Sequence, residues 1–207
     1  MANKLIDEKI NDYVDALSSG APTPGGGAVA ALTAAQGAAL IMMVANLTVG
    51  KKKYAEFEEL NVAAIEEAKG YLDQLMAGVD EDKKAFGQVA SAYGMPKDTD
   101  EEKAARSEAI AIASVGAAEA PLKVMRAGTC ALRLADSLIG RSNKQLASDL
   151  YVAALNLNAG VGAAEFNVSA NVPYILDREL AESWKKESEN LSEEANTVST
   201  KILCSKK

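Results

Sequence analysis

The feature that most constrains the fold is a long stretch, Ala28 to Val49, that is apolar on almost every side when drawn as a helix. It contains no proline, and Gly37 is its only interior helix breaker. A helix that is hydrophobic all round is buried in a protein core or lies in a membrane. Because Gly, Gln and Asn interrupt this run, we expect a central core helix and no membrane span.

The other segments repeat apolar residues at steps of three and four, which is typical of helices that cover such a core. We find no segment with the period of two that indicates a strand. The expected helices cover residues 5–17, 28–49, 54–95, 99–120, 121–139, 148–171 and 177–203. The length of 207 residues fits one domain, residues 1–207. The sequence therefore predicts an all-α, up-and-down bundle of about six to eight helices.

Several residues mark where these helices begin and end. Thr99 and Glu102 have the spacing of a capping box, in which each side chain bonds the backbone of the other. Pro121 either kinks the helix that follows or begins a new one. Ser148, or a residue near it, is expected to cap the next helix, and Pro173 to end it.

Charge and composition exclude several classes of function. The chain has 22 basic and 29 acidic residues, a net charge of -7, so we expect no general nucleic-acid or acidic-membrane binding. Its two cysteines lack the spacing of metal ligands and indicate reduced thiols in the cytoplasm. It contains no histidine, so an enzyme with this sequence must use a carboxylate, lysine, tyrosine or cysteine as its acid or base.

Asp82 is the carboxylate that stands out. Steps of three and four residues along the apolar stripe between Val79 and Phe86 fall on Asp82, which places it on the packed side of its helix. Burial raises the pKa of a carboxyl group and suits it to proton transfer near neutral pH. The alternative is that Asp82 lies at a local helix break after Gly78, where it caps a helix or meets water.

The loop before the apolar helix, Pro24, Gly25, Gly26 and Gly27, is a second candidate site. A glycine-rich loop that opens a helix can present backbone N–H groups to an anion. It lacks the Gly-Lys-Ser/Thr sequence of a phosphate-binding loop, and no strand precedes it as a dinucleotide site requires. The alternative is a tight turn between two packed helices.

Three further groups of polar residues have both a structural and a functional interpretation. Lysines after a helix end either interact with its dipole or dock an anionic ligand. A polar group at a helix start serves as a cap, and two amides one turn apart either bridge helices or bind a polar heterocycle. The residues are Lys51, Lys52, Lys53 and Tyr54; Asn143, Ser148 and Asp149; and Asn167 and Asn171.

Five motifs together resemble the formiminotetrahydrofolate cyclodeaminase family, which includes stand-alone bacterial methenyltetrahydrofolate cyclohydrolases. They occur in order over nearly the whole chain: PTPGGGAVAAL from Pro22, MVANLTVGKKKY from Met43, DKKAFGQVASAYGMPKDTDEEKAAR from Asp82, SNKQLASD from Ser142 and EFNVSAN from Glu165. Ser142 departs from the glycine expected before Asn143, which concerns only the turn at that point.

The resemblance implies a helical subunit that forms a homodimer or a higher homo-oligomer and holds folate in a cleft near the subunit interface. It implies that Asp82 is the catalytic residue, that the glycine loop borders the folate, and that Lys51–Lys53 and Tyr54 lie close to it.

The implied reactions are hydrolysis of the 5,10-methenyl bridge of tetrahydrofolate and release of ammonia from formiminotetrahydrofolate. Both need one group that takes and gives protons, and neither needs a metal or a redox cofactor. The alternative function is a non-catalytic helical protein that binds folate or supports an assembly.

Overall fold

The computed structural model describes residues 4–206, and it is a helical bundle without a strand in that range. The six α-helices are α1 Ile10–Ser18, α2 Gly26–Asn46, α3 Glu58–Tyr93, α4 Asp100–Leu138, α5 Ala147–Asn171 and α6 Arg178–Cys204. Short 3-10 helices are η1 Leu5–Asp7, η2 Lys52–Phe57, η3 Lys144–Leu146 and η4 Val172–Tyr174. The predicted all-α bundle and its number of helices are confirmed.

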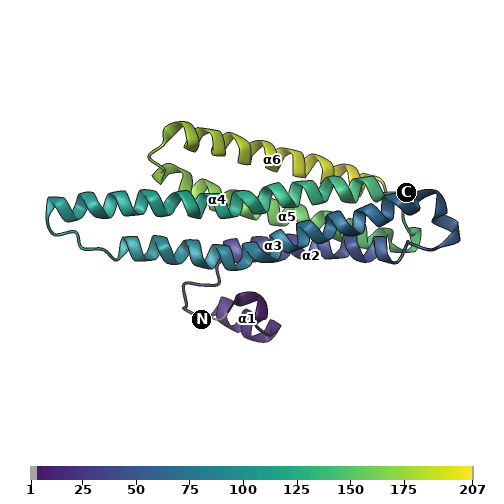
Figure 1. Ribbon diagram of the computed structural model, residues 1–207, viewed down its shortest axis with the longest axis horizontal. Coiled ribbons are helices and arrows are strands. Elements are labelled where there is room, and N and C mark those ends of the chain that lie inside the picture. The colour runs from purple at the N-terminus through teal and green to yellow at the C-terminus, as the bar shows by residue number, and fades with distance from the viewer. Residues whose placement is uncertain (1–3, 207) are drawn as a thin grey trace.

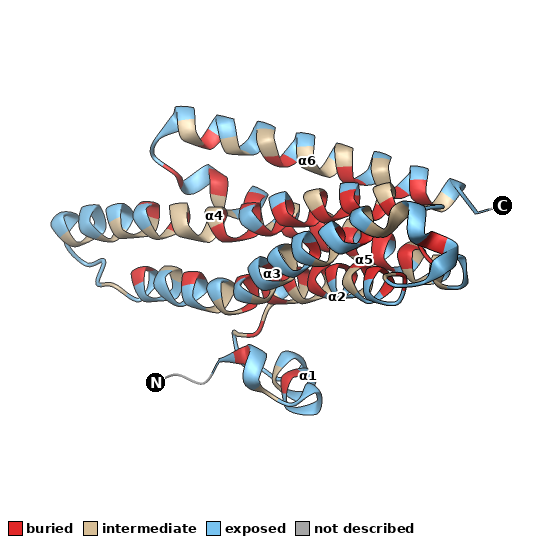
Figure 2. Cartoon of the chain, turned by 45° about the vertical axis from the view of Figure 1, so that its right-hand side comes forward, coloured by how far each residue is buried: buried red, intermediate tan, exposed pale blue. Residues whose placement is uncertain are grey.

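Helices α2 to α5 run side by side along the long axis of the molecule, and α6 packs along α4 and α5 (Figure 1). Helix α1 lies apart from this bundle, below α3 in that view. The α3–α4 hairpin extends past the other helices at one end. Its tip is mostly exposed, whereas α2 and the neighbouring turns of α4 and α5 are largely buried (Figure 2).

Helix α2 is the core helix that the apolar stretch predicts. Ala31, Ala34, Ala38 and Ile41 have no exposed surface. A Cβ atom on Gly160 of α5 would lie 2.8 Å from the carbonyl oxygen of Ala30, so this glycine lets the α5 backbone approach α2 closely. The length and composition of α2 alone would suit a membrane span, but more than half of it is buried in the bundle, as in the core helix of a globular fold.

The helix boundaries confirm one part of the prediction and correct two others. Thr99 and Glu102 form the predicted capping box at the start of α4. Pro121 neither ends nor begins a helix, because α4 continues through it to Leu138. Both flanks of that proline pack against the core, which offsets the lost backbone hydrogen bond. Ser148 caps nothing: α5 already begins at Ala147, and Ser148 is exposed in its first turn.

Two predicted apolar stripes are only partly buried. In the N-terminal segment Leu5 and Tyr13 are buried, whereas Ile10 is exposed because no other helix of the chain covers that side of α1. On α3, Val79 is buried but Phe86 and Tyr93 are exposed, because that part of the helix extends past α2 and α5.

Candidate active site

Asp82 of α3 lies directly against the first turn of α2. A Cβ atom on Gly27 would stand 2.0 Å from the Oδ1 atom of Asp82, so no residue with a side chain fits there without displacing the carboxylate. The backbone N–H of Ala28 donates a hydrogen bond of 3.0 Å to Oδ2 of Asp82. The glycine loop, Pro24 to Gly27, and Asp82, which are 55 to 58 residues apart in the chain, therefore form one site.

The start of α2 explains why a carboxylate is stable in this position. Gly25 is the N-cap residue of α2 and offers no side chain to bond the free N–H groups of the first turn. Asp82 supplies that acceptor from a neighbouring helix, and the positive end of the α2 dipole favours its negative charge. The first turn of α2, which follows the glycine loop, thus holds the Asp82 carboxylate.

The environment of Asp82 alters its acidity. Burial raises the pKa of this carboxyl group above its ordinary value, and the hydrogen bond from Ala28 opposes that shift without cancelling it. Asp82 therefore keeps or takes a proton more readily than an exposed aspartate. This is the property expected of a general acid and base.

Asp80, two residues before Asp82 on α3, is half-buried. Its Oδ1 atom accepts a hydrogen bond of 2.7 Å from the backbone N–H of Leu5. The side chain of Leu5 is buried in the core. Asp80 thus holds the N-terminal segment against α3 two residues before the candidate acid.

Asn167 and Asn171 of α5 belong to the same end of α2. A Cβ atom on Gly26 would lie 3.9 Å from Oδ1 of Asn167, which places this amide beside the glycine loop. The amide nitrogen of Asn167 donates to the carbonyl oxygen of Ala163, and that of Asn171 donates to the carbonyl oxygens of Asn167 and Ala117. Asn171 therefore bridges α5 to α4, while Asn167 keeps its side-chain oxygen beside Gly26.

The remaining predicted residues form a second group at the other end of α2. There the Tyr54 hydroxyl accepts a hydrogen bond from the backbone N–H of Lys144, and the backbone N–H of Asn143 donates to Thr48. The Asn143 side chain caps η3 by accepting from the backbone N–H of Gln145. These polar groups are satisfied within the chain and join the α2–α3 connection to the α4–α5 connection.

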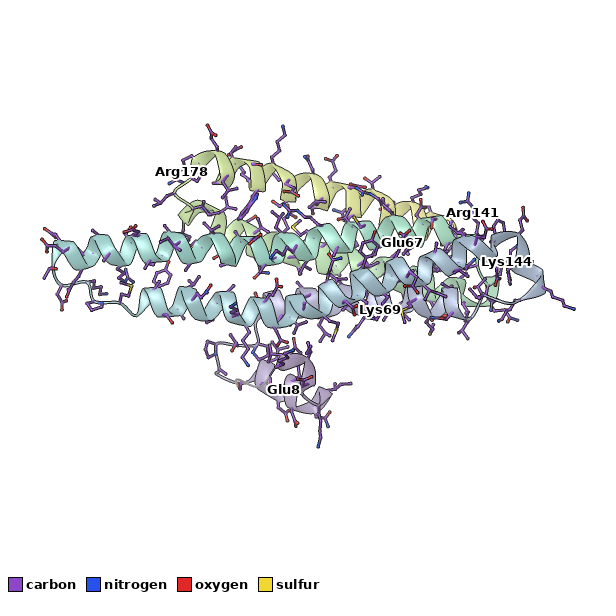
Figure 3. The ribbon with its side chains drawn as sticks, viewed as in Figure 1. Glu8, Glu67, Lys69, Arg141, Lys144 and Arg178 are labelled. Carbon is purple, nitrogen blue, oxygen red and sulfur yellow. The ribbon has the colours of Figure 1, made fainter. Side chains whose placement is uncertain are left out.

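Lys51–Lys53 are exposed in this second group, and Asp149 lies half-buried in the first turn of α5. Lys144, which Figure 3 labels near the end of the bundle, belongs to the same region. Helix α2 has 21 residues, so at 1.5 Å per residue the two groups are about 30 Å apart. Within one chain, the lysines cannot reach a ligand atom that contacts Asp82.

The residues that the structure describes contain no group of three or more acidic or cysteine side chains able to hold a metal ion. Cys130 and Cys204 are both free thiols. The polar groups at the start of α2 are the Asp82 carboxylate, the backbone N–H of Ala28 and the side-chain amide of Asn167.

The fold and the site together define a class: a helical bundle in which a half-buried aspartate rests on the glycine-opened start of the core helix. A family model described as formiminotransferase-cyclodeaminase matches residues 9–190. The chain belongs to this family, as the five motifs predict.

Individual relatives agree with this assignment. The methenyltetrahydrofolate cyclohydrolase of Methylorubrum extorquens is 42% identical over 196 residues, which cover 95% of this chain and 94% of the relative. The formimidoyltransferase-cyclodeaminase of Rattus norvegicus is 32% identical over 199 residues, and the match spans 96% of this chain but 37% of that protein. The crystal structure of the formiminotetrahydrofolate cyclodeaminase from Thermotoga maritima superimposes with a TM-score of 0.87 at 26% identity, covering 98% and 97% of the two chains.

Proposed function

We propose that this chain is an enzyme of tetrahydrofolate one-carbon metabolism that hydrolyses and forms the 5,10-methenyl bridge of tetrahydrofolate. The observation that carries the proposal is the contact between Asp82 and Gly27, since it combines a carboxyl of raised pKa with a glycine whose missing side chain leaves room for that carboxyl. The Methylorubrum protein, which this chain matches over nearly its full length, is named for that activity.

Asp82 can carry both proton transfers of the hydrolysis. As water adds to the methenyl carbon, its oxygen forms a bond to that carbon and Asp82 takes one of its protons. The carbon is then tetrahedral and bonded to two nitrogens. When one C–N bond breaks, Asp82 returns its proton to the departing nitrogen, and the proton of the new hydroxyl leaves to solvent as the formyl C=O forms. General acid–base catalysis of this kind contributes about 10² to 10⁴ in rate.

The same site supports a second reaction, the release of ammonia from formiminotetrahydrofolate. There N10 attacks the formimino carbon carried by N5, the C–N bond to the formimino nitrogen breaks, and Asp82 would protonate the departing ammonia. The names of the rat and Thermotoga relatives favour this candidate. Neither reaction requires a metal or a redox cofactor, because each consists of addition, proton transfer and elimination. We place both in the cytoplasm, which suits two free thiols.

A side-by-side assay with methenyl- and formiminotetrahydrofolate tests the proposal. We expect purified protein to hydrolyse the methenyl compound, followed by loss of its absorbance, faster than it releases ammonia from the formimino compound. Saturable binding of both compounds without turnover of either would contradict the proposal and favour the non-catalytic folate-binding alternative.

We further propose that the working form is a homodimer whose subunits share each folate site. Large apolar side chains are exposed on the packed pair α2 and α5 and at the end of α2, including Met43, Leu47, Leu155 and Phe166, of which Phe166 is 79% exposed. A subunit interface would cover such apolar side chains. A two-fold axis perpendicular to α2 would run the partner's α2 antiparallel, which would bring the partner's lysine end towards the Asp82 end of this chain.

This arrangement accounts for the two groups of candidate residues about 30 Å apart. Lys51–Lys53 would then meet the anionic glutamate tail of a folate whose reacting carbon lies at Asp82 of the other subunit. Mixing two variant chains tests it. In a hybrid of Asp82→Asn with the triple variant Lys51→Gln, Lys52→Gln, Lys53→Gln, a shared site predicts one fully wild-type site per dimer and regained low-KM turnover. A mixture with no gain over the two separate variants would contradict the shared site.

A further inference from the structure

Tyr13 is the one residue of α1 that is buried, with 8% of its surface exposed. Its hydroxyl oxygen is out of contact with solvent and has no hydrogen-bond partner among the described residues. A buried phenol without a partner is unfavourable, because the group loses its hydrogen bonds to water and gains none in return. A phenylalanine would pack in the same place without that cost, so the hydroxyl itself needs an explanation.

The surroundings of Tyr13 connect it with the candidate acid. Its ring borders a cavity of about 320 Å³ between the N-terminal segment and the bundle. The walls of that cavity include Val79, three residues before Asp82 on α3, and Leu32, four residues after Ala28 on α2. The hydroxyl thus lies on the side of the bundle where Asp82 meets the start of α2.

Electrostatics point to the same neighbourhood. Burial raises the pKa of the Tyr13 phenol, and the negative charges of Asp82 and, to a smaller extent, Glu8 raise it further. Figure 3 labels Glu8 on the segment that precedes α1. The phenol therefore keeps its proton at neutral pH and is a hydrogen-bond donor that no acceptor among the described residues satisfies.

Resting on the proposed function, we infer that Tyr13 is a further catalytic residue, whose hydroxyl donates a hydrogen bond to the oxygen that adds to the substrate carbon beside Asp82. The bound oxygen supplies the partner that the buried hydroxyl lacks. No proton moves from Tyr13 in this step: Asp82 takes the proton of the attacking water, and the phenol stabilises the negative charge that develops on the oxygen in the tetrahedral state.

The N-terminal segment gains a role from this inference. Helix α1 has few contacts with the bundle, and its exposed residues include Ile10 and Val14. The segment is held by the buried side chain of Leu5, by the hydrogen bond from Leu5 to Asp80 and by Tyr13 itself. We therefore expect α1 to complete the site and to contribute little to the stability of the core.

The test is Tyr13→Phe, which removes the hydroxyl and nothing else. Tyr71→Phe is the matched control, because Tyr71 is also partly buried against the bundle but lies beside Cys130 and Arg133, eleven residues before Asp82 on α3. For Tyr13→Phe we expect kcat for methenyltetrahydrofolate to fall about 10- to 100-fold, since one donor to a developing oxyanion has an effect of this order. KM should change less than about twofold, and the melting temperature should stay the same or rise.

For Tyr71→Phe we expect kcat and KM to stay at the wild-type values. A Tyr13→Phe protein with kcat within about twofold of the wild type would overturn the role of Tyr13 while leaving the proposed function intact. Wild-type protein that turns over neither methenyl- nor formiminotetrahydrofolate in the same assay would overturn the proposed function and this inference together.

Discussion

The two ends of helix α2 differ in how their polar groups are satisfied. At the start of the helix, Asp82 is half-buried, accepts a single hydrogen bond from Ala28 and has a raised pKa. At the other end, Tyr54 and Asn143 are buried and bonded to backbone groups of the same chain, while the lysines beside them are exposed.

This difference indicates that the two ends of α2 have different roles, one in proton transfer and one in binding and stability. A polar group whose hydrogen bonds are all made within its own chain cannot readily bond a substrate. A partly buried carboxyl with a raised pKa can exchange protons with a substrate. We therefore expect the lysine end to provide structure and positive charge, and the aspartate end to provide reactivity. Changes at the first turn of α2 should affect kcat, and changes at the far end should affect KM or stability.

Gly27→Ala should have the largest effect among changes that leave Asp82 itself in place. The new methyl group would lie 2.0 Å from the present position of Oδ1 and must displace the carboxylate. We expect kcat to fall by about 10² to 10⁴, the usual contribution of a general acid–base group. The control is Gly70→Ala on α3, where a Cβ atom meets nothing within 4 Å. It should keep full activity and gain about 0.5–1 kcal/mol of stability.

The pH dependence of hydrolysis should follow the raised pKa of Asp82. The base must be ionised, so kcat/KM should fall about tenfold per pH unit on the acidic side. Because burial raises this pKa, that decline should begin at a higher pH than an ordinary aspartate with a pKa of about 3.9 would produce. A profile that stays flat down to pH 4 would mean that the catalytic base is another group.

Neutralising Lys51–Lys53 to glutamine should raise KM by up to about tenfold with little change in kcat, since exposed ion pairs each contribute about 0.2–1 kcal/mol. The effect should be greatest for polyglutamylated substrate and should shrink as salt is added, because salt screens exposed charges. An unchanged KM in low salt would mean that these lysines only interact with the dipole of α2 and do not bind the substrate.

Of these variants, Thr48→Val should have the smallest effect on activity. Thr48 is 1% exposed, donates to the carbonyl oxygen of Val44 and accepts from the backbone N–H of Asn143. Valine keeps the shape but leaves that N–H without a partner, so we expect a loss of about 1–3 kcal/mol in the free energy of unfolding. Chemical denaturation measures this, and kcat of the folded variant should remain that of the wild type.

Much of the fold follows from the sequence because local signals agree with packing. The apolar run predicts α2, the Thr99–Glu102 box predicts the start of α4, and the stripe through Val79 marks Asp82 as facing inward. Periodicity assigns a residue to a side of a helix, but it does not say how far the neighbouring helices extend. For that reason it failed for Phe86, which lies past the end of the core.

The arrangement of the site was harder to predict, because spacing in the chain says little about distances across a bundle. The contact between Gly27 and Asp82 depends on the register of α2 against α3, which no local motif encodes. The hydroxyl of Tyr13 has no signal at all, since the stripe on α1 predicts only an apolar, inward-facing ring. Composition, in contrast, limits the candidates for the acid or base: because the chain lacks histidine, a carboxylate becomes a leading candidate.

The most direct test of the account is the activity of Asp82→Asn with methenyltetrahydrofolate, measured together with its thermal unfolding. Asparagine can still accept the hydrogen bond from Ala28, and it removes a carboxyl whose raised pKa makes ionisation costly to the folded state as the pH rises. We therefore expect a protein that is at least as stable as the wild type at neutral pH and whose kcat is lower by about 10² to 10⁴. Full turnover by a folded Asp82→Asn protein would contradict the central claim that this carboxylate moves the protons of the reaction.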